Sequence, residues 1–256
     1  MDNYLGPLID ERAKQDYVDF YAHLHRVVDE RIGRLLRALG PADDGGSLRS
    51  RTIVIRTSDH GEMGLSHGGL RQKVFNAYEE TIRVPLVVSN PRLFRQPRES
   101  DALVSLLDVL PTCMSLAGPG KLPQSLDGED LTPVISGQAP AVRDAVLFTY
   151  DDHQAGTALQ DGAGQPNRIR CVRDGRYKYA VYLDPAARAR PEYELYDLQE
   201  DPLELRNLVD VRSGRVFERR HEDERGRLAA RLAELCTASA TLAPRLPASP
   251  ALAGYA

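Results

Sequence analysis

The run of β-branched apolar residues Ile53–Ile55, which ends abruptly in Asp59, His60 and Gly61, constrains the fold more than any other part of the sequence. Continuous apolar runs of this kind are typical of strands that are buried in a parallel sheet. In open α/β sheets, the groups just past the carboxyl end of a strand face the ligand crevice. The sequence therefore predicts an α/β fold with a ligand site directly after this strand.

The polar side chains after this strand suit a cation and an anionic substrate. Asp59 offers an oxygen ligand and His60 a nitrogen ligand, and Gly61 lets the backbone bend so that both converge on one ion. Hard or borderline divalent cations take such ligands. His67 and Lys73 add an imidazole and an ammonium, which suit a sulfuryl or phosphoryl group in transfer. An Asp that caps the next turn, a His packed at a strand end or in a loop, and a solvated Lys are the alternatives that the residues leave open.

The remaining pattern predicts an α/β region followed by a smaller β-rich region. Helical spacing of apolar residues covers 13–39, as a single buried stripe, and 101–116, where Pro111 predicts a kink. A short helix is predicted at 74–82 and a last helix from about 216 to 236. Strands are predicted at 52–57, 84–89, 144–150, 168–182 (a hairpin that turns at Asp174–Gly175) and 192–197.

The composition excludes several classes of protein. The 256 residues are 42% hydrophobic and 27% charged, as in an ordinary soluble globular protein with a substantial core. A net charge of −4 gives no sign of a general nucleic-acid surface. Cys113, Cys171 and Cys236 lack the spacing of a zinc site and are expected to be buried. The absence of a signal peptide and of a membrane span predicts a cytoplasmic location by default and leaves the compartment unknown.

Several motifs in a fixed order make the chain similar to a known family. Ser58–Met63, Ser66–Lys73, Tyr78–Glu80 and Arg83–Leu86 resemble the C-terminal part of a type I, formylglycine-type sulfatase of the alkaline-phosphatase superfamily. The resemblance runs from about residue 15 to 210 and includes Tyr21–Leu39, Asp108–Thr112, Leu116–Gly118, Leu126–Gly128, Arg176–Tyr179, Glu194–Leu198 and Arg206–Leu208. So many matches in the family's own order make the resemblance specific to this family.

The resemblance implies an architecture as well as a family. Residues 1–140 are expected to form the C-terminal part of the catalytic α/β domain, a partial alkaline-phosphatase-like sandwich with a mostly parallel sheet and flanking helices. Residues 141–240 are expected to form a smaller antiparallel β subdomain with a C-terminal helix. Residues 241–256 are expected to form a loose tail.

The resemblance also assigns roles to the residues after the first strand. It makes Asp59 and His60 metal ligands, with Ca²⁺ the usual ion of the family. It makes Lys73 a contact of the sulfate and His67 a polar active-site group beside it. Lys73 and His67 are therefore the catalytic residues that the resemblance implies.

A second strand, 145–150, runs into Asp151, Asp152 and His153. In a permuted fold these acids would complete the metal shell, but no nucleophile motif follows them and the surrounding sequence keeps the family's usual order. A loop at the rim of the pocket, in which His153 and Arg170 contact the substrate, is one remaining interpretation. A purely structural strand end is the other.

The nucleophile of these sulfatases has no counterpart in the sequence. The family uses a formylglycine made from Cys or Ser in the pattern C/S-x-P/A-x-R, and none of the three cysteines stands in it. The nearest approach, Ser89–Leu93, has its Arg displaced by one position and ends a predicted inner strand. The resemblance therefore implies that the segment with the nucleophile and the first metal ligands is lacking and that this chain is inactive alone.

Three functions remain open. The first is hydrolysis of a sulfate ester, in a small molecule or a sugar, when the lacking segment is supplied. The second is a phosphodiester or phosphonate monoester hydrolase of the same superfamily, because those enzymes reuse the Asp-His-Gly and Lys elements. The third is a non-catalytic half-domain that binds anions or a partner chain.

The partners and the cation affinity follow from the same reasoning. A sheet without its first strands leaves an exposed edge, which an N-terminal half or a second copy is expected to cover. No nucleic acid and no membrane are expected as partners. Weak Ca²⁺ binding is predicted for this chain alone, since Ca²⁺ prefers roughly six to eight oxygen ligands.

Overall fold

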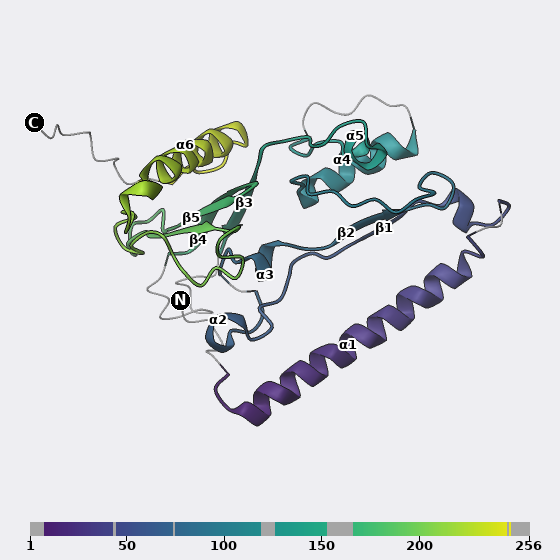
Figure 1. The fold of residues 1–256 in the computed structure, drawn as a ribbon, viewed down its shortest axis with the longest axis horizontal. Helices are drawn as coiled ribbons and strands as arrows, with labels where there is room; N and C mark the ends of the chain where they lie inside the picture. The colour runs from purple at the N-terminus through teal and green to yellow at the C-terminus, as the bar shows by residue number, and fades with distance from the viewer. Residues whose placement is uncertain are drawn as a thin grey trace, which may run out of the picture. The chain divides into compact units, whose positions relative to one another are not determined.

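The computed structural model describes residues 8–42, 45–73, 75–118, 126–152, 166–244 and 246, and Figure 1 shows their helices and strands. The chain divides into two compact units, which are described separately below. The first unit comprises Met1–Val74 and Tyr78–Ser100, and the second comprises Phe75–Ala77 and Asp101–Ala256. The domain boundary predicted near residue 140 stays a prediction.

The first unit begins with the long helix α1, Glu11–Ala38. Its N-terminus is capped by Asp10, whose Oδ1 accepts a hydrogen bond of 2.8 Å from the backbone N–H of Ala13. The predicted helix is thus confirmed, but the predicted burial of its apolar stripe is wrong, because none of its 28 residues is buried. Phe20 is 62% exposed and Leu35 69% exposed. Tyr17, Val27, Ile32 and Leu36 of the stripe are half-buried, so the described part of the chain covers the stripe only in part.

Two short strands follow in the same unit. The 3₁₀ turn Arg49–Arg51 leads into β1, Val54–Thr57, which pairs antiparallel with β2, Leu86–Ser89. Both predicted strands are confirmed, but the prediction that β1 is buried in a parallel sheet is wrong for this pair, whose residues are half-buried or exposed. Parallel neighbours need a long crossover, usually a helix. The connection here contains only α2, Ser66–Gly69, and α3, Glu79–Ile82, each of four residues.

Helices at the start of the second unit are short. A 3₁₀ turn, Leu106–Asp108, leads into α4, Val109–Ala117, and α5 covers Thr132–Ser136. Pro111 therefore lies in the first turn of α4, where its lack of an N–H removes no helical hydrogen bond. The predicted helix over 101–116 begins later than expected, at Val109, and so Pro111 does not kink it.

An antiparallel four-stranded sheet forms the rest of the second unit, in the order β3-β4-β5-β6. The strands are β3 Ala145–Asp151, β4 Arg168–Asp174, β5 Tyr177–Leu183 and β6 Glu192–Asp197. The predicted hairpin turn is confirmed, since Asp174 Oδ1 accepts backbone N–H bonds from Arg176 and Tyr177. After the 3₁₀ turn Arg219–His221, the chain ends its regular structure in α6, Glu222–Ala238, as predicted.

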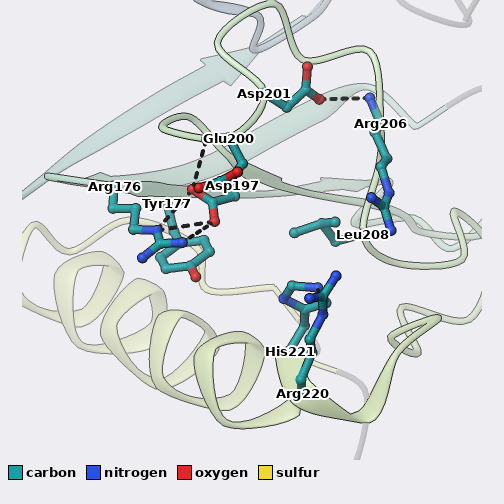
Figure 2. Close-up of a pocket in the computed structure, with 9 residues that line it drawn as sticks. All are labelled: Arg176, Tyr177, Asp197, Glu200, Asp201, Arg206, Leu208, Arg220 and His221. Atoms are coloured by element: carbon teal, nitrogen blue, oxygen red, sulfur yellow. Dashed lines mark hydrogen bonds and ion pairs between the residues drawn. The ribbon is translucent and has the colours of Figure 1, made fainter.

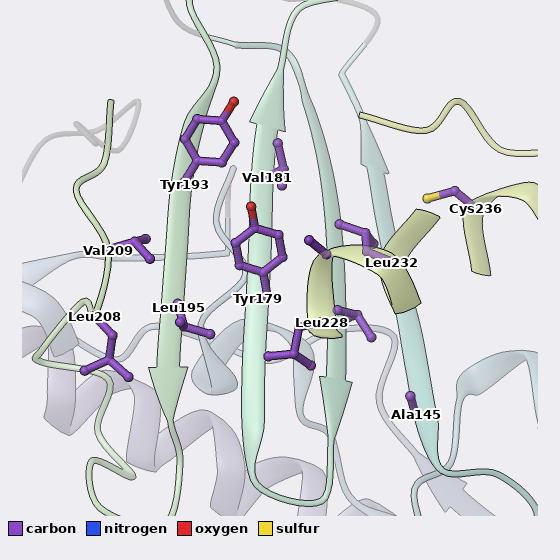
Figure 3. Packing of buried hydrophobic residues seen from close by; sticks show 12 residues of the cluster. Ala145, Tyr179, Val181, Tyr193, Leu195, Leu208, Val209, Leu228, Leu232 and Cys236 are labelled. Carbon is purple, nitrogen blue, oxygen red and sulfur yellow. The ribbon is translucent and has the colours of Figure 1, made fainter. Parts of the chain in front are cut away.

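The hydrophobic core lies between this sheet and α6 (Figure 3). Leu228 and Leu232 of α6 are fully buried in one cluster with Tyr179, Val181 and Leu195 of the sheet. Burying one such Leu side chain stabilises a fold by about 1.5–3 kcal/mol. Cys171 and Cys236 are buried as predicted, whereas Cys113 is only half-buried, and all three are free thiols.

The end of the chain is described only in part. Leu242 accepts a hydrogen bond from Arg170 through its carbonyl, and Leu246 packs against the core cluster. The other residues of the predicted loose tail beyond 244 lie outside the described residues. Among the helices that the structure describes, none is both long and apolar enough to cross a membrane.

Candidate functional site

The candidate site begins where β1 ends, at the turn that carries Asp59 and His60. Gly61 donates its backbone N–H to the carbonyl of Thr81 over 2.8 Å, which ties this turn to the end of α3. A Cβ atom on Gly61 would lie 1.9 Å from the carbonyl oxygen of Glu80. Only glycine fits this close approach, so the sequence Asp-His-Gly fixes the turn locally.

One proton on the His60 ring is assigned by its hydrogen bonds. Nδ1 lies 2.8 Å from the carbonyl oxygen of Gly61, which can only accept, so Nδ1 carries the proton. Nε2 lies 2.6 Å from Nζ of Lys73, and because an ammonium group can only donate, Nε2 presents its lone pair to Lys73. A backbone carbonyl that orients the outer imidazole nitrogen is typical of histidines that act as metal ligands.

Asp59 and Lys73 meet His60 from two sides. Asp59 Oδ2 lies 3.4 Å from His60 Nε2, and the side chain of Asp59 is 84% exposed. The hydrogen bond from the backbone N–H of His60 is the largest influence on the carboxyl group of Asp59 and lowers its pKa. Asp59 therefore stays ionised at neutral pH, and the structure brings these three predicted residues together around one imidazole nitrogen.

The chemistry of this donor set fits a divalent cation in part. An ionised carboxylate and an imidazole lone pair are ordinary ligands of hard or borderline cations. Within the described residues, however, no group of three or more His, Cys, Asp or Glu side chains is arranged to hold a metal ion. The chain thus contributes the oxygen of Asp59 and the nitrogen of His60, which do not complete a coordination shell.

His67 lies apart from Asp59, His60 and Lys73, in a segment with left-handed backbone (φ 51°). Its ring stacks on Tyr78 at a centroid distance of 3.7 Å, and its Nε2 lies 3.6 Å from an oxygen of Glu80. The side chain is only 10% exposed, and Nε2 has no hydrogen-bond partner among the residues that the structure describes. These contacts lock the loop, and the catalytic role of His67 stays a prediction.

The two residues predicted at the rim have different outcomes. His153 lies outside the described residues. Arg170 is buried and binds Asp151 over 2.7 Å and the carbonyl of Leu242 over 2.9 Å. Burial alone would raise the pKa of Asp151, but its hydrogen bonds with Arg170 and Arg168 outweigh that effect and lower it. These contacts support the interpretation of a structural strand end, and a substrate contact of Arg170 stays a prediction.

Glu62 is a residue that sequence reasoning missed. Its Oε1 accepts hydrogen bonds from the hydroxyl of Tyr17 over 2.5 Å and from the backbone N–H of Gln72 over 2.7 Å. Burial, followed by the hydrogen bond to Glu62, raises the pKa of Tyr17 to about 12. Nothing in the sequence marks such a contact, because its main partner is a backbone amide ten residues away.

A pocket of about 530 Å³ in the second unit contains none of the predicted site residues (Figure 2). It is lined by Arg176, Tyr177, Asp197, Glu200, Asp201, Arg206, Leu208, Arg220 and His221. Arg176 binds the lining residue Asp197 over 2.6 Å, whereas Arg220 lies 2.9 Å from Glu218, which is not part of the lining. Three arginines and three acidic side chains line the pocket.

Two family profiles match this chain. The profile described as N-sulphoglucosamine sulphohydrolase, C-terminal, matches residues 67–228, which is more than half of the chain. The profile described as Sulfatase matches residues 6–119. The chain belongs to the sulfatase family. The resemblance found in the sequence is thus confirmed, and Asp59, His60 and Lys73 lie within the matched regions.

Known proteins agree with this assignment. Arylsulfatase K of Mus musculus is 33% identical over 209 residues, which cover 81% of this chain and 35% of the relative. The solved structure of a 2-O GAG sulfatase is 26% identical, with a TM-score of 0.72 over 90% of this chain and 45% of that one. A protein solved in complex with its substrate D-glucosamine-2-N,6-O-disulfate is 27% identical, with a TM-score of 0.66 over 83% and 39% of the two chains.

A phosphonate monoester hydrolase from Silicibacter pomeroyi shares the fold, with a TM-score of 0.63 over 83% of this chain and 39% of that one, but at 22% identity. These likenesses confirm the predicted sulfatase-like α/β fold with a small antiparallel sheet and a C-terminal helix. This chain spans less than half the length of each of these relatives.

Proposed function

We propose that the protein takes part in the hydrolysis of sulfate esters, and that Asp59, His60 and Lys73 form one wall of the active site. The observation that carries this proposal is the meeting of a carboxylate, an imidazole lone pair and an ammonium within 3.4 Å in a sulfatase-family chain. The contact between these groups can be replaced when ions bind. An anion would then pair with the ammonium of Lys73, and a cation would pair with the carboxylate of Asp59 and the lone pair of His60.

Each residue has a distinct part in this proposal. The ammonium of Lys73 donates hydrogen bonds to the sulfate oxygens and stabilises the charge that they gain in transfer. Asp59 and His60 would contribute an oxygen and a nitrogen to a divalent cation, Ca²⁺, which would supply further positive charge at those oxygens. The carbonyl of Gly61 keeps His60 in the tautomer that presents Nε2. His67 is the group proposed to protonate the leaving oxygen.

The formylglycine of the family does not fit this chain. Cys171 and Cys236 are buried and Cys113 is half-buried, and none lies in the required pattern. We therefore assign no step to a nucleophile within this sequence. We propose that the nucleophile and the remaining metal ligands come from polypeptide that is not part of this chain, and that the chain alone has no turnover.

The partner surface in this proposal is the exposed stripe of α1. A 28-residue helix with no buried residue leaves large apolar side chains such as Phe20 and Leu35 in water. This chain spans 35% of the length of one relative and 45% of another, which supports the remaining part of a sulfatase domain as the partner rather than a second copy.

The proposed substrate is a sulfated sugar. The support comes from the names of the relatives, which include a GAG sulfatase and a protein bound to a glucosamine disulfate. A phosphonate or phosphate ester is the second candidate, supported by the fold shared with a phosphonate monoester hydrolase.

Calorimetry and turnover assays test the proposal. The chain is titrated with CaCl₂ and with sodium sulfate and is then incubated with an aryl sulfate, a glucosamine 6-sulfate and an aryl phosphonate. We expect Ca²⁺ to bind more weakly than micromolar, sulfate to bind, and no ester to be cleaved. Sub-micromolar Ca²⁺ binding would contradict the incomplete shell, and cleavage of the phosphonate alone would favour the second candidate. If Lys73→Ala and Asp59→Asn bind sulfate as tightly as the wild type, the result would favour the non-catalytic half-domain that binds anions or a partner chain.

A further inference from the structure

We propose that Glu62 is a positioning residue: it holds the backbone of Gln72 and thereby sets where Lys73 places its ammonium. This inference rests on the sulfate-binding role proposed above for Lys73. Among the described residues, no side chain of Asp59 or His60 is hydrogen-bonded to Glu62. It acts through the chain that leads to Lys73.

The evidence begins with the carboxylate itself. Glu62 Oε1 accepts a hydrogen bond of 2.7 Å from the backbone N–H of Gln72, the residue directly before Lys73. The same oxygen accepts a longer bond of 3.3 Å from the N–H of Gly64. Hydrogen bonds to an ionised acceptor are roughly twice as strong as neutral ones. One carboxylate thus joins the two ends of the loop between Glu62 and Lys73.

The neighbouring residue holds the other polar group of Gln72. The backbone N–H of Met63 donates to the carbonyl of Gln72 over 2.9 Å. Met63 is 1% exposed, and its sulfur accepts a hydrogen bond of 3.2 Å from the hydroxyl of Thr81 at the end of α3. Both backbone groups of Gln72 are therefore fixed by consecutive residues that are themselves anchored in the first unit.

The backbone of Gln72 needs such support. Its φ is 62°, in the left-handed region that a residue with a Cβ atom adopts only when its surroundings hold it there. Leu65, earlier in the same loop, has φ 75°. Loss of the bond to Glu62 removes one of the bonds that hold Gln72 at positive φ, and a return to negative φ would turn the direction in which Lys73 leaves the loop.

Lys73 gains from this support because its own side chain is long and flexible. A lysine on a mobile backbone loses much conformational entropy when its ammonium is held at one place. A fixed backbone at Gln72 removes part of that loss before an anion binds. The 2.6 Å contact between Lys73 Nζ and His60 Nε2 is the result of this placement.

Tyr17 extends the arrangement to α1. Its hydroxyl donates to Glu62 Oε1 over 2.5 Å, which fixes the carboxylate that in turn fixes Gln72. A tyrosine hydroxyl is protonated throughout the neutral range, so this bond is a donation from Tyr17 to the carboxylate. The helix therefore reaches the candidate site through Glu62.

The test compares Glu62→Ala, Glu62→Gln and, as a matched exposed acid on α1, Glu30→Gln in the full chain. Glu62→Ala removes the acceptor, and we expect the amide of Gln72 to exchange with solvent roughly tenfold faster or more. Sulfate affinity is expected to fall by a similar factor. Glu62→Gln keeps an acceptor oxygen and should restore most of both properties, and Glu30→Gln should change neither. Where Glu62→Ala does not fold, Tyr17→Phe, which leaves the Gln72 bond in place, should give a smaller increase in exchange.

A double-mutant cycle with Lys73→Ala separates positioning from a general structural effect. Because Glu62 acts through Lys73, Glu62→Ala should not weaken sulfate binding further in the Lys73→Ala background. An equal loss in both backgrounds, or unchanged exchange at Gln72 in Glu62→Ala, would overturn the inference. Equal sulfate binding by the wild type and Lys73→Ala would instead reject the proposed function. Exchange at Gln72 would then still decide whether Glu62 holds this backbone.

Discussion

The two units of the chain differ in where they keep their apolar residues. In the second unit, α6 and four strands bury a continuous cluster that includes Leu195, Leu228 and Leu232. In the first unit, α1 buries nothing and two short strands are half-exposed, yet this unit carries Asp59, His60 and Lys73. The unit with the proposed site is thus the one with the exposed helix, whereas the other unit contains the hydrophobic core cluster.

The largest expected effect contrasts one core leucine with one exposed leucine. Leu228→Ala should lower the free energy of unfolding of the second unit by about 2–5 kcal/mol, because it leaves a cavity under α6. Leu35→Ala, at a position 69% exposed on α1, should change the free energy of unfolding of the first unit by less than about 0.5 kcal/mol. Urea unfolding of both variants measures the difference. Equal destabilisation would mean that α1 is already packed and would break the contrast between the units.

The next effect is a dependence of stability on pH. Burial is the largest influence on Glu194 and raises its pKa from 4.5 to about 7. The folded chain then binds this proton more tightly than the unfolded chain, so the contribution is fully present below about pH 4.5 and is lost as pH rises to about 7. The loss amounts to up to about 3 kcal/mol. Urea unfolding between pH 4.5 and 7 should show this decline, and Glu194→Gln should flatten it.

Asp59 provides the opposite sign in the first unit. Its pKa is lowered, so any stability that it contributes is present above its ordinary pKa and is lost as the pH falls below it. The free energy of unfolding of the wild type could instead fall as the pH is lowered from 7 to 4.5, and Glu194→Gln could leave this dependence unchanged. That result would contradict the assignment of the pH dependence to Glu194.

A smaller effect concerns the ligand affinity of the first unit. Lys73→Ala should weaken the binding of inorganic sulfate by at least about tenfold, or about 1.4 kcal/mol, because it removes the ammonium beside His60. Titration calorimetry measures it, with Arg220→Ala in the pocket of the second unit as the control. The reverse pattern, with loss only in Arg220→Ala, would move the anion site to the second unit.

The smallest effect is expected at the contact of α1 with Glu62. Tyr17→Phe removes one hydrogen bond, which is worth about 1 kcal/mol. Hydrogen exchange of the amides in the first turns of α1 should accelerate, while amides of β5 should not change. Unchanged exchange in α1 would show that Tyr17 does not hold the helix.

The sequence predicts the second unit better than the first. The bounds of β6, Glu192–Asp197, agree with the prediction, because strand patterns and turn residues such as Asp174 act over short distances. Asp59, His60 and Lys73 were predicted together because a local Gly61 turn and a family resemblance both act on them.

What the sequence did not predict depends on contacts between distant segments. The apolar stripe of α1 has the spacing of a buried face, but spacing alone does not show whether another segment buries it. None of the described segments does so, since no residue of α1 is buried. The antiparallel pairing of β1 with β2 depends on a connection without a crossover helix. The bond from Gln72 to Glu62 is made by backbone, which carries no sequence signal.

We propose that Asp59, His60 and Lys73 of the first unit form one wall of a sulfatase active site. Titration of the isotopically labelled chain with CaCl₂ and sodium sulfate, followed residue by residue in NMR spectra, measures whether the two ions bind there. We predict that the largest shifts fall on Asp59, His60 and Lys73 and that the shifts disappear in Lys73→Ala for sulfate. Shifts confined to Arg176, Arg220 and His221 in the second unit would contradict it.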